Sequence, residues 1–346
     1  MQPLLLSLAL LASADLYDIQ VRKLVDGVYV ASRADPLRPY VEGNSTVIVN
    51  EHDVVVVDAG GSPRIARNTI AEIRKLTPNP VRYVVLTHIH RDHRFGLQEY
   101  LTAFPGVEVI AHPAVRQVVE GPNGRDFVAG RIKRLEDNRA EVPKDVQALR
   151  AEGKPGHEKI VAVLERYAAD VPVLIEEYRT VRNLGPTATF EQKLTLHRGA
   201  RAIDILFLGR GDTDHDIVVH LPREKIVVTG DMVVHPFPFG SSPHPSEWIA
   251  TLGRLAALDF EQLIPGHGDV QQGKAHVRRT IDLVQSVRTQ VRAARAAGLD
   301  LEATRAKVDL APFEREVLGD DPVARYFFRQ NFTEPAVAAA FKEAAE

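Results

Sequence analysis

A cluster of ionisable side chains follows directly after an apolar run, and it constrains this chain more than any other feature. The run VRYVVLT ends at Thr87 and is typical of a buried strand, and the next six residues, 88–93, are HIHRDH. A loop that leaves the carboxyl end of a strand can direct alternate side chains into one crevice. Three imidazoles and a carboxylate are costly to gather there without a cation, and they suit zinc or iron. The cluster therefore predicts a metal site at one edge of a β-sheet.

The chain contains no cysteine in its 346 residues. This excludes disulfide frameworks, thiol nucleophiles, zinc fingers and iron–sulfur clusters. Any metal must therefore be held by His, Asp or Glu, and the sequence supplies 13 histidines.

The charge balance argues against a nucleic-acid substrate. Lys and Arg number 43 against 46 Asp and Glu, so the formal net charge is -3. A chain without excess positive charge lacks the electrostatic footprint that binds polyphosphate backbones. With 45% hydrophobic and 26% charged residues, the composition is that of a globular protein. We expect a small-molecule substrate and no nucleic-acid partner, and the sequence indicates no particular oligomeric state.

The first residues have the pattern of an export signal. An apolar run from Pro3 to Leu11 precedes Ala12-Ser13-Ala14, which is the small-x-small pattern found before signal cleavage sites. The run is too short for a stable membrane anchor, which needs about 20 apolar residues. Because the stretch has no Lys or Arg, a buried amino-terminal strand or helix is the alternative. The pattern predicts a signal peptide over 1–14 and a periplasmic or secreted protein, with a cytoplasmic one as the alternative.

The order of the elements predicts a single α/β domain over 15–346. Short β-rich runs, a helix over Pro63–Leu76 and further β-rich runs alternate, as in a layer of helices packed on sheets. Long charged stretches with helical spacing separate two β-rich halves and predict a helical insertion over 113–184. The spacing is again helical at the end of the chain, which predicts a helical tail over 273–346.

The residues HIHRDH match the H-x-H-x-D-H signature of the metallo-β-lactamase fold superfamily, which this chain therefore resembles. Three further positions follow the order of that family, namely Asp58 in VVVVDAGG, Asp231 in VVTGD and His267 in IPGHG. Together these positions extend the resemblance over about residues 26–270. It implies an α/β fold built as a four-layer αββα sandwich, with metals at one edge of the two sheets.

The resemblance also implies how two zinc ions are held. Two histidines would bind the first metal, an aspartate and two histidines the second, and another aspartate would lie between them. In that order, these residues are His88 and His90; Asp92, His93 and His267; and Asp231. Asp92 would also orient a metal-bound hydroxide and is the catalytic residue of this scheme, because a bound cation lowers the pKa of water to about 7. Asp58 would keep a structural hydrogen-bonding role.

One position departs from the family pattern. The third ligand of the first metal is a histidine in that family, and the matching stretch LGRGDTDH has Asp212 in its place. A carboxylate still binds zinc but favours harder ions, so manganese or iron can occupy the first site. Two alternatives remain: His215, three residues on, supplies the ligand, or the first site is degenerate and binds little metal.

Other residues near these motifs are weaker candidates. Asn44 resembles a family asparagine near the metals, and His112 is expected to cap a helix or lie at the surface rather than to bind metal. The Pro- and Phe-rich stretch HPFPFGSSPH is typical of a loop, in which Phe237 and Phe239 either line a substrate pocket or pack in the ordinary way.

Three functions are compatible with these residues. The first is a metal-dependent hydrolase in which a metal-bound hydroxide attacks the carbonyl of a β-lactam, lactone, ester or thioester. The second is a mononuclear iron oxygenase resembling the persulfide dioxygenases, with two histidines and a carboxylate as a facial triad. The third is a binding protein on a catalytically decayed site. Because the ligands of a second metal are retained, the sequence favours the hydrolase.

Overall fold

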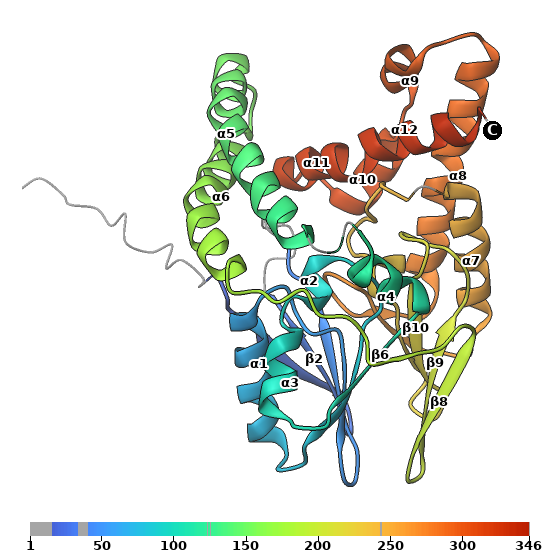
Figure 1. The fold of residues 1–346 in the computed structure, drawn as a ribbon. Helices are drawn as coiled ribbons and strands as arrows, with labels where there is room; N and C mark the ends of the chain where they lie inside the picture. The colour runs from blue at the N-terminus through green and yellow to red at the C-terminus, as the bar shows by residue number, and fades with distance from the viewer. Residues whose placement is uncertain (1–15, 34–40, 123, 125, 243, 346) are drawn as a thin grey trace, which may run out of the picture.

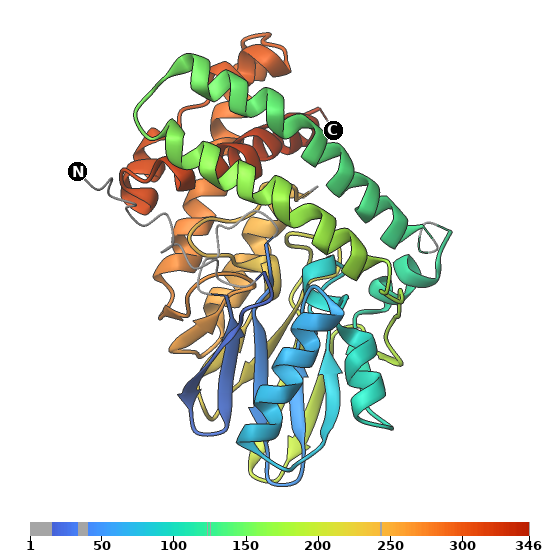
Figure 2. The ribbon, with the colours of Figure 1, turned by 90° about the vertical axis from the view of Figure 1, so that its left-hand side faces the viewer.

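The computed structural model describes residues 16–33, 41–122, 124, 126–242 and 244–345. Two β-sheets face each other, and helices cover both outer faces (Figures 1 and 2). The predicted four-layer αββα sandwich is confirmed. The export signal predicted for 1–14 lies outside the described residues. Among the described residues, no helix is both long and apolar enough to span a membrane.

The first sheet has seven strands in chain order. They are β1 (Gln20–Val25), β2 (Val28–Ser32), β3 (Ser45–Val49), β4 (Val54–Val57), β5 (Val81–Val85), β6 (Glu108–Ala111) and β7 (Ala188–Thr189). Strands β1 to β4 pair antiparallel and β4 to β7 pair parallel. Parallel neighbours need crossover connections. Helix α1 (Pro63–Leu76) makes the first crossover with the bounds that the sequence predicts, and the short helices α2 (Arg91–Arg94) and α3 (Leu97–Ala103) make the second.

The second sheet has six strands and carries its own helical layer. In spatial order they are β13 (Gln271–Gln272), β12 (Gln262–Ile264), β11 (Ile226–Val228), β10 (Ile217–Leu221), β9 (Arg201–Phe207) and β8 (Lys193–Arg198). A short 3-10 helix, η1 (Gly230–Met232), follows β11. Helices α7 (Pro245–Ala257) and α8 (Ala275–Ala296) pack on the outer face through one large apolar cluster.

The central strands are apolar on both faces because each face is covered. In β4, Val54 and Val56 pack against α1, whereas Val55 and Val57 pack between the two sheets. Successive side chains of a strand point to opposite faces, so a strand covered on both sides needs a continuous apolar run. The four consecutive valines of the sequence meet this need.

The two long helices of the insertion and the part of the tail after α8 lie over the same end of the sandwich (Figures 1 and 2). The insertion contains α4 (Pro113–Glu120), α5 (Phe127–Glu152) and α6 (His157–Tyr178). The tail continues after α8 with α9 (Leu301–Lys307), α10 (Ala311–Leu318), α11 (Pro322–Phe328), the π-helical turn η2 (Arg329–Thr333) and α12 (Glu334–Glu343). Helices α5 and α6 form an antiparallel hairpin, and α6 contacts α11.

Both ends of the α5–α6 hairpin are held at one point beside α2. The buried Arg94 donates Nε to the carbonyl of Ile89 at 2.8 Å and Nη1 to Oδ1 of Asn183 at 2.7 Å. Asn183, just after α6, donates Nδ2 to the carbonyl of Gly124, just before α5, at 2.6 Å. The start and the end of the α5–α6 hairpin are therefore joined to the same segment, residues 89–94.

Arg201 connects the two sheets at the end opposite to residues 88–93. It lies at the start of β9 and donates Nη1 to the carbonyl of Val49 at 2.8 Å and to Oδ1 of Asn50 at 3.0 Å. Its Nε lies 2.8 Å from the carboxylate of Glu224, and the Arg201 side chain is only 14% exposed. Its guanidinium therefore satisfies groups from both sheets at once.

We predict that Arg201→Ala lowers the free energy of unfolding by about 2–4 kcal/mol, because it leaves a buried carboxylate and a strand-end carbonyl without a donor. Denaturant titration followed by circular dichroism measures the change. Arg22→Ala is the matched control, since Arg22 pairs with Asp269 at 3.7 Å and both side chains are more than half exposed. The control should change stability by less than about 0.5 kcal/mol. Equal effects of the two substitutions would contradict the proposed role of Arg201.

Candidate metal centre

The metal loop, which we define as residues 88–93, is anchored by the carboxylate of Asp58. Asp58 directly follows β4, and its backbone lies in the left-handed region with a φ of 64°. Its Oδ1 accepts the backbone N–H of Thr87 at 2.8 Å, and its Oδ2 accepts the Thr87 hydroxyl at 2.8 Å. Nδ1 of His93 lies 2.7 Å from the same Oδ2. A proton on this Nδ1 leaves Nε2 of His93 free to bind a cation.

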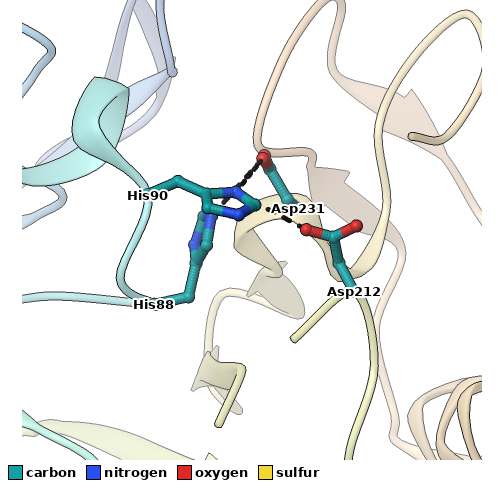
Figure 3. A group of neighbouring side chains, drawn as sticks. All are labelled: His88, His90, Asp212 and Asp231. Atoms are coloured by element: carbon teal, nitrogen blue, oxygen red, sulfur yellow. Dashed lines mark ion pairs between the residues drawn. The ribbon is translucent and has the colours of Figure 1, made fainter. Parts of the chain in front are cut away.

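The first group of ligand atoms comes from both halves of the sandwich (Figure 3). Nε2 of His88 and Nδ1 of His90 lie 3.4 and 3.5 Å from Oδ2 of Asp231. Nδ1 of His90 also lies 3.6 Å from Oδ2 of Asp212. One ligand atom from each of the four residues falls within 4.8 Å of the others. The first cluster is thus His88, His90, Asp212 and Asp231.

The second cluster shares Asp231 with the first. Oδ1 of Asp231 lies 3.1 Å from Nε2 of His93 and 3.2 Å from Nε2 of His267. Oδ2 of Asp92 lies 3.1 Å from Nε2 of His267. The second cluster is thus Asp92, His93, Asp231 and His267. Asp231, on η1, presents one carboxylate oxygen to each cluster, which is the arrangement of a bridging ligand.

Together the clusters contain all seven side chains that the sequence analysis names as ligands, and their polar atoms fit a pair of cations. Both carboxylate oxygens of Asp212 and of Asp231 are buried and form no hydrogen bond within the described part of the chain. The same is true of Nε2 of His88. Buried polar atoms without partners are costly. Divalent cations would coordinate them, and this set of imidazoles and carboxylates suits zinc, manganese or iron. The clusters therefore fit a dinuclear metal site.

Charges of neighbours set the protonation of the second cluster. Burial opposes charge on His267, but the carboxylates of Asp231 and Asp92 raise the pKa of His267 to about 9. Burial likewise opposes charge on His93, yet Asp231 and Asp58 raise the pKa of His93 well above its ordinary value. Burial would raise the pKa of Asp231, but His267 and His93 hold it well below its usual range. A cation that binds here must displace protons from both histidines, so its affinity should rise with pH.

The first cluster has a neutral imidazole in place. Burial, followed by the charge of His93, lowers the pKa of His88 to about 4. His88 is therefore neutral at pH 7, which is the form of imidazole that binds metals. Burial raises the pKa of Asp212 well above its ordinary value, so a cation in this cluster would also stabilise the Asp212 carboxylate.

The turn after β9 presents Asp212 rather than His215 to the first cluster. Asp212 is 3% exposed, and the turn is held by the carboxylate of Asp216, which accepts the backbone N–H of Thr213 at 2.7 Å. His215 is also buried, and burial lowers its pKa to about 3. Within the described residues, however, neither group of potential ligands includes His215. The geometry therefore favours Asp212 as the third ligand of the first site.

Asn44 fixes the loop that carries His267. Its Nδ2 donates to the carbonyls of Pro265 and Gly268, both at 2.9 Å, and its backbone N–H donates to the carbonyl of Gly266 at 2.7 Å. The resemblance placed this asparagine near the metals, and the structure shows that it holds the His267 loop through three hydrogen bonds.

The remaining candidates have different positions in the structure. Phe237 is 3% exposed and packs edge to face on Phe328 in the core, and it also lines the narrow cleft at His267. Phe239 contacts the ring of His267, with centroids 5.3 Å apart. His112 accepts the backbone N–H of Ala114 at 3.3 Å and caps α4, as expected.

The sequence analysis does not identify two glycines that contact the ligands of the clusters. A Cβ at Gly43 would lie 2.6 Å from the ring of His93, and a Cβ at Gly266 would lie 2.1 Å from Oδ1 of Asp231. Both positions therefore require glycine so that the backbone can approach the ligands closely. The only sequence signal is their position beside Asn44 and His267, which does not reveal the contact.

A cavity of about 420 Å³ adjoins the metal loop. Its walls come from the metal loop, the α5–α6 hairpin, the loop at Phe239 and the segment α11–η2. A narrow cleft that includes His267 shares Val41, Phe239, Phe327 and Asn331 with this cavity. The helical insertion and the helical tail thus form the space next to the second cluster.

The sandwich thus brings two His/Asp clusters that share one aspartate to the ends of the strands. The family model of the metallo-beta-lactamase superfamily matches residues 38–267, and the chain belongs to this superfamily. This membership confirms the family that the sequence analysis names.

Alkylsulfatases are among the proteins that this chain resembles. A linear primary-alkylsulfatase of Pseudomonas sp. is 24% identical over 294 residues, which cover 80% of this chain and 51% of that protein. The structure of the inverting sec-alkylsulfatase Pisa1 from Pseudomonas sp. has a TM-score of 0.66 at 16% identity and covers 94% of this chain and 50% of its own. The structure of a metallo-beta-lactamase from Pontibacter korlensis has a TM-score of 0.52 at 17% identity. This match covers 78% of this chain and 99% of the lactamase. The chain spans about half the length of the two alkylsulfatases.

We predict that Asp58→Asn weakens zinc binding about 10- to 100-fold, because an amide no longer holds the proton on Nδ1 of His93. Competition with a chromophoric chelator measures the affinity. Asp53→Asn, at the other end of the strand and paired with Arg198 at 3.0 Å, is the control and should bind zinc as the unaltered protein does. Identical affinities in both variants would show that Asp58 does not orient His93.

We predict that Asp212→Ala retains one metal per chain, whereas His215→Ala and Asp212→His retain two. The first substitution leaves three ligands in the first cluster, namely His88, His90 and Asp231, whereas the other two leave four. Native mass spectrometry after zinc titration counts the ions. Loss of one metal only in the His215 variant would identify that histidine as the ligand instead.

Proposed function

We propose that this protein is a metallo-hydrolase that cleaves sulfate esters of small alcohols. The observation that carries the proposal is the cavity beside the second cluster, whose lining combines arginines with apolar side chains. A sulfate ester has an anionic head and an apolar body, so each part has a matching surface. The names of the two alkylsulfatase relatives support the same substrate class.

The two clusters would hold one cation each, and we propose zinc in both, with manganese or iron as alternatives at the carboxylate-rich first site. Two bound cations would supply an activated water and Lewis acidity towards the ester. The overall reaction adds water to the ester and releases an alcohol and hydrogen sulfate.

Asp92 is the residue that we propose to orient the attacking water. Its Oδ2 faces His267 at 3.1 Å, and its other oxygen would accept a hydrogen bond from the water. Burial would raise the pKa of Asp92, but Arg91, His267 and His93 hold it well below its ordinary value. Asp92 therefore stays a carboxylate and an acceptor throughout the neutral pH range.

The other functions considered have less support. Neutral lactones, esters and thioesters have no anionic group for the arginines of the cavity to bind. β-Lactams do carry a carboxylate, but the two alkylsulfatases are named for sulfate esters. A mononuclear oxygenase does not need the second cluster, which is complete. A binding protein with a catalytically decayed site does not require seven potential ligands in two compact groups.

We predict that the purified protein releases sulfate from 1-octyl sulfate or 2-octyl sulfate, as measured by ion chromatography. Chelation should abolish the release, and added zinc should restore it. His90→Ala and Asp92→Ala should each reduce kcat/KM by about 1000-fold or more, because each removes a ligand and Asp92 also orients the water. Turnover of β-lactams, lactones or thioesters without any release of sulfate would refute the proposed substrate class.

A further inference from the structure

The cavity beside the metal loop carries opposite charges at its two ends. Arg91 of the metal loop and Arg131 and Arg134 of α5 line one end. Glu141 and Asp145 line it further along the same helix. With a rise of 1.5 Å per residue, Asp145 lies about 21 Å along α5 from Arg131. The cationic end of the cavity is therefore the end next to the metal loop.

The fold holds these cationic side chains close together. Burial lowers the pKa of Arg131, and the charges of Arg91 and Arg134 lower it further. Arg91 is fixed against α6, where its Nη1 donates to the hydroxyl of Tyr178 at 3.0 Å. The carboxylate of Asp92 acts in the opposite direction on the pKa of Arg131, but burial and the two arginines outweigh it. An anion that binds between Arg91 and Arg131 would relieve their repulsion.

Apolar side chains also line the cavity. On α5, Leu135 lies between Arg134 and Glu141, and Val142 follows Glu141. Leu164 of α6 and Phe327 of α11 add to this apolar wall, and Phe239 contacts the ring of His267. An amphiphilic molecule with its anionic group at the arginines would therefore place its hydrocarbon part against these side chains.

We propose that Arg131, together with Arg91, binds the sulfate group of the substrate while the apolar wall binds its alkyl chain, so that Arg131 determines specificity for anionic esters. This inference rests on the proposed function and identifies the residue that recognises the charge of the substrate. The planar fork of a guanidinium can donate two parallel hydrogen bonds to an oxyanion, which an ammonium cannot do. In this proposal the insertion selects substrates with an anionic group, and the two clusters hold the cations needed for hydrolysis of the ester.

Binding of 1-octanesulfonate tests the subsite without hydrolysis. We expect Arg131→Ala to raise its Kd about 10- to 100-fold in calorimetry, and Arg131→Lys to give an intermediate rise. Lys133→Ala removes a charge from the same helix outside the cavity, where Lys133 pairs with Asp137 at 2.8 Å, and it should leave the Kd unchanged. Binding of neutral 1-octanol should be the same in all variants. Titration with inorganic sulfate shows whether the sulfate group binds without an alkyl chain. Titration with 1-octylphosphonate shows whether another oxyanion binds in its place.

Kinetics with 1-octyl sulfate give a second and independent readout. We expect Arg131→Ala to raise KM by the same factor as Kd, with kcat within about twofold, because the contact is made equally in the bound substrate and in the transition state. Arg131 also lies over the ring of Phe127 at 5.4 Å, so thermal melting of each variant checks the fold. If Arg131→Ala does not fold, the Kd and KM of Arg131→Lys test the inference instead.

The outcomes distinguish this inference from the proposed function. Octanesulfonate binding that depends on Arg131, without turnover of any sulfate ester, supports the anion subsite and refutes sulfatase activity. Sulfate ester turnover with KM and Kd unchanged in the Arg131 variants overturns the inference and leaves the proposed function intact. Equal losses in the Arg131 and Lys133 variants also overturn it, because net charge alone would then explain the effect.

Discussion

The metal centre depends on one buried carboxylate, that of Asp58. It accepts both donors of Thr87 and faces Nδ1 of His93, and it therefore joins the end of β4, the end of β5 and the metal loop. These contacts exist only if the two parallel strands are in register, as the pairing of Val57 with Val85 shows. The orientation of His93, and through it the position of the second cluster, thus follows from strand pairing in the core.

The parts of the structure that local sequence determines could be predicted from it. The metal loop is contiguous, and the bounds of α1 follow from Ser62 at its N-cap and Pro63 at its first position. The cavity could not be predicted, because it joins α5 to η2, almost two hundred residues later. Likewise, both Asp212 and His215 could have supplied a ligand, and only the conformation of the turn favours the first. Similarly, only the structure shows that Phe237 packs on Phe328 whereas Phe239 contacts His267.

The carboxylate of Asp212 and the arginines of the cavity are connected through charge. Two divalent cations would bring four positive charges, against three from Asp92, Asp212 and Asp231. With a hydroxide as a further ligand, the centre would be neutral overall, whereas a histidine in place of Asp212 would leave one positive charge. A neutral centre attracts an anionic substrate weakly. In this chain the attraction would come from Arg91 and Arg131 in the cavity wall instead.

The junction formed by Arg94, Asn183 and Gly124 makes the α5–α6 hairpin a separable module. Because both of its ends meet at one point, a replacement segment of another length would close the same gap, and doubling a flexible loop costs only about 0.6 kcal/mol in closure entropy. The ligands all lie outside 113–184, so such an exchange leaves the reactive centre intact. If the hairpin binds the substrate as we propose, its exchange would change the substrate range while the two clusters stay unaltered.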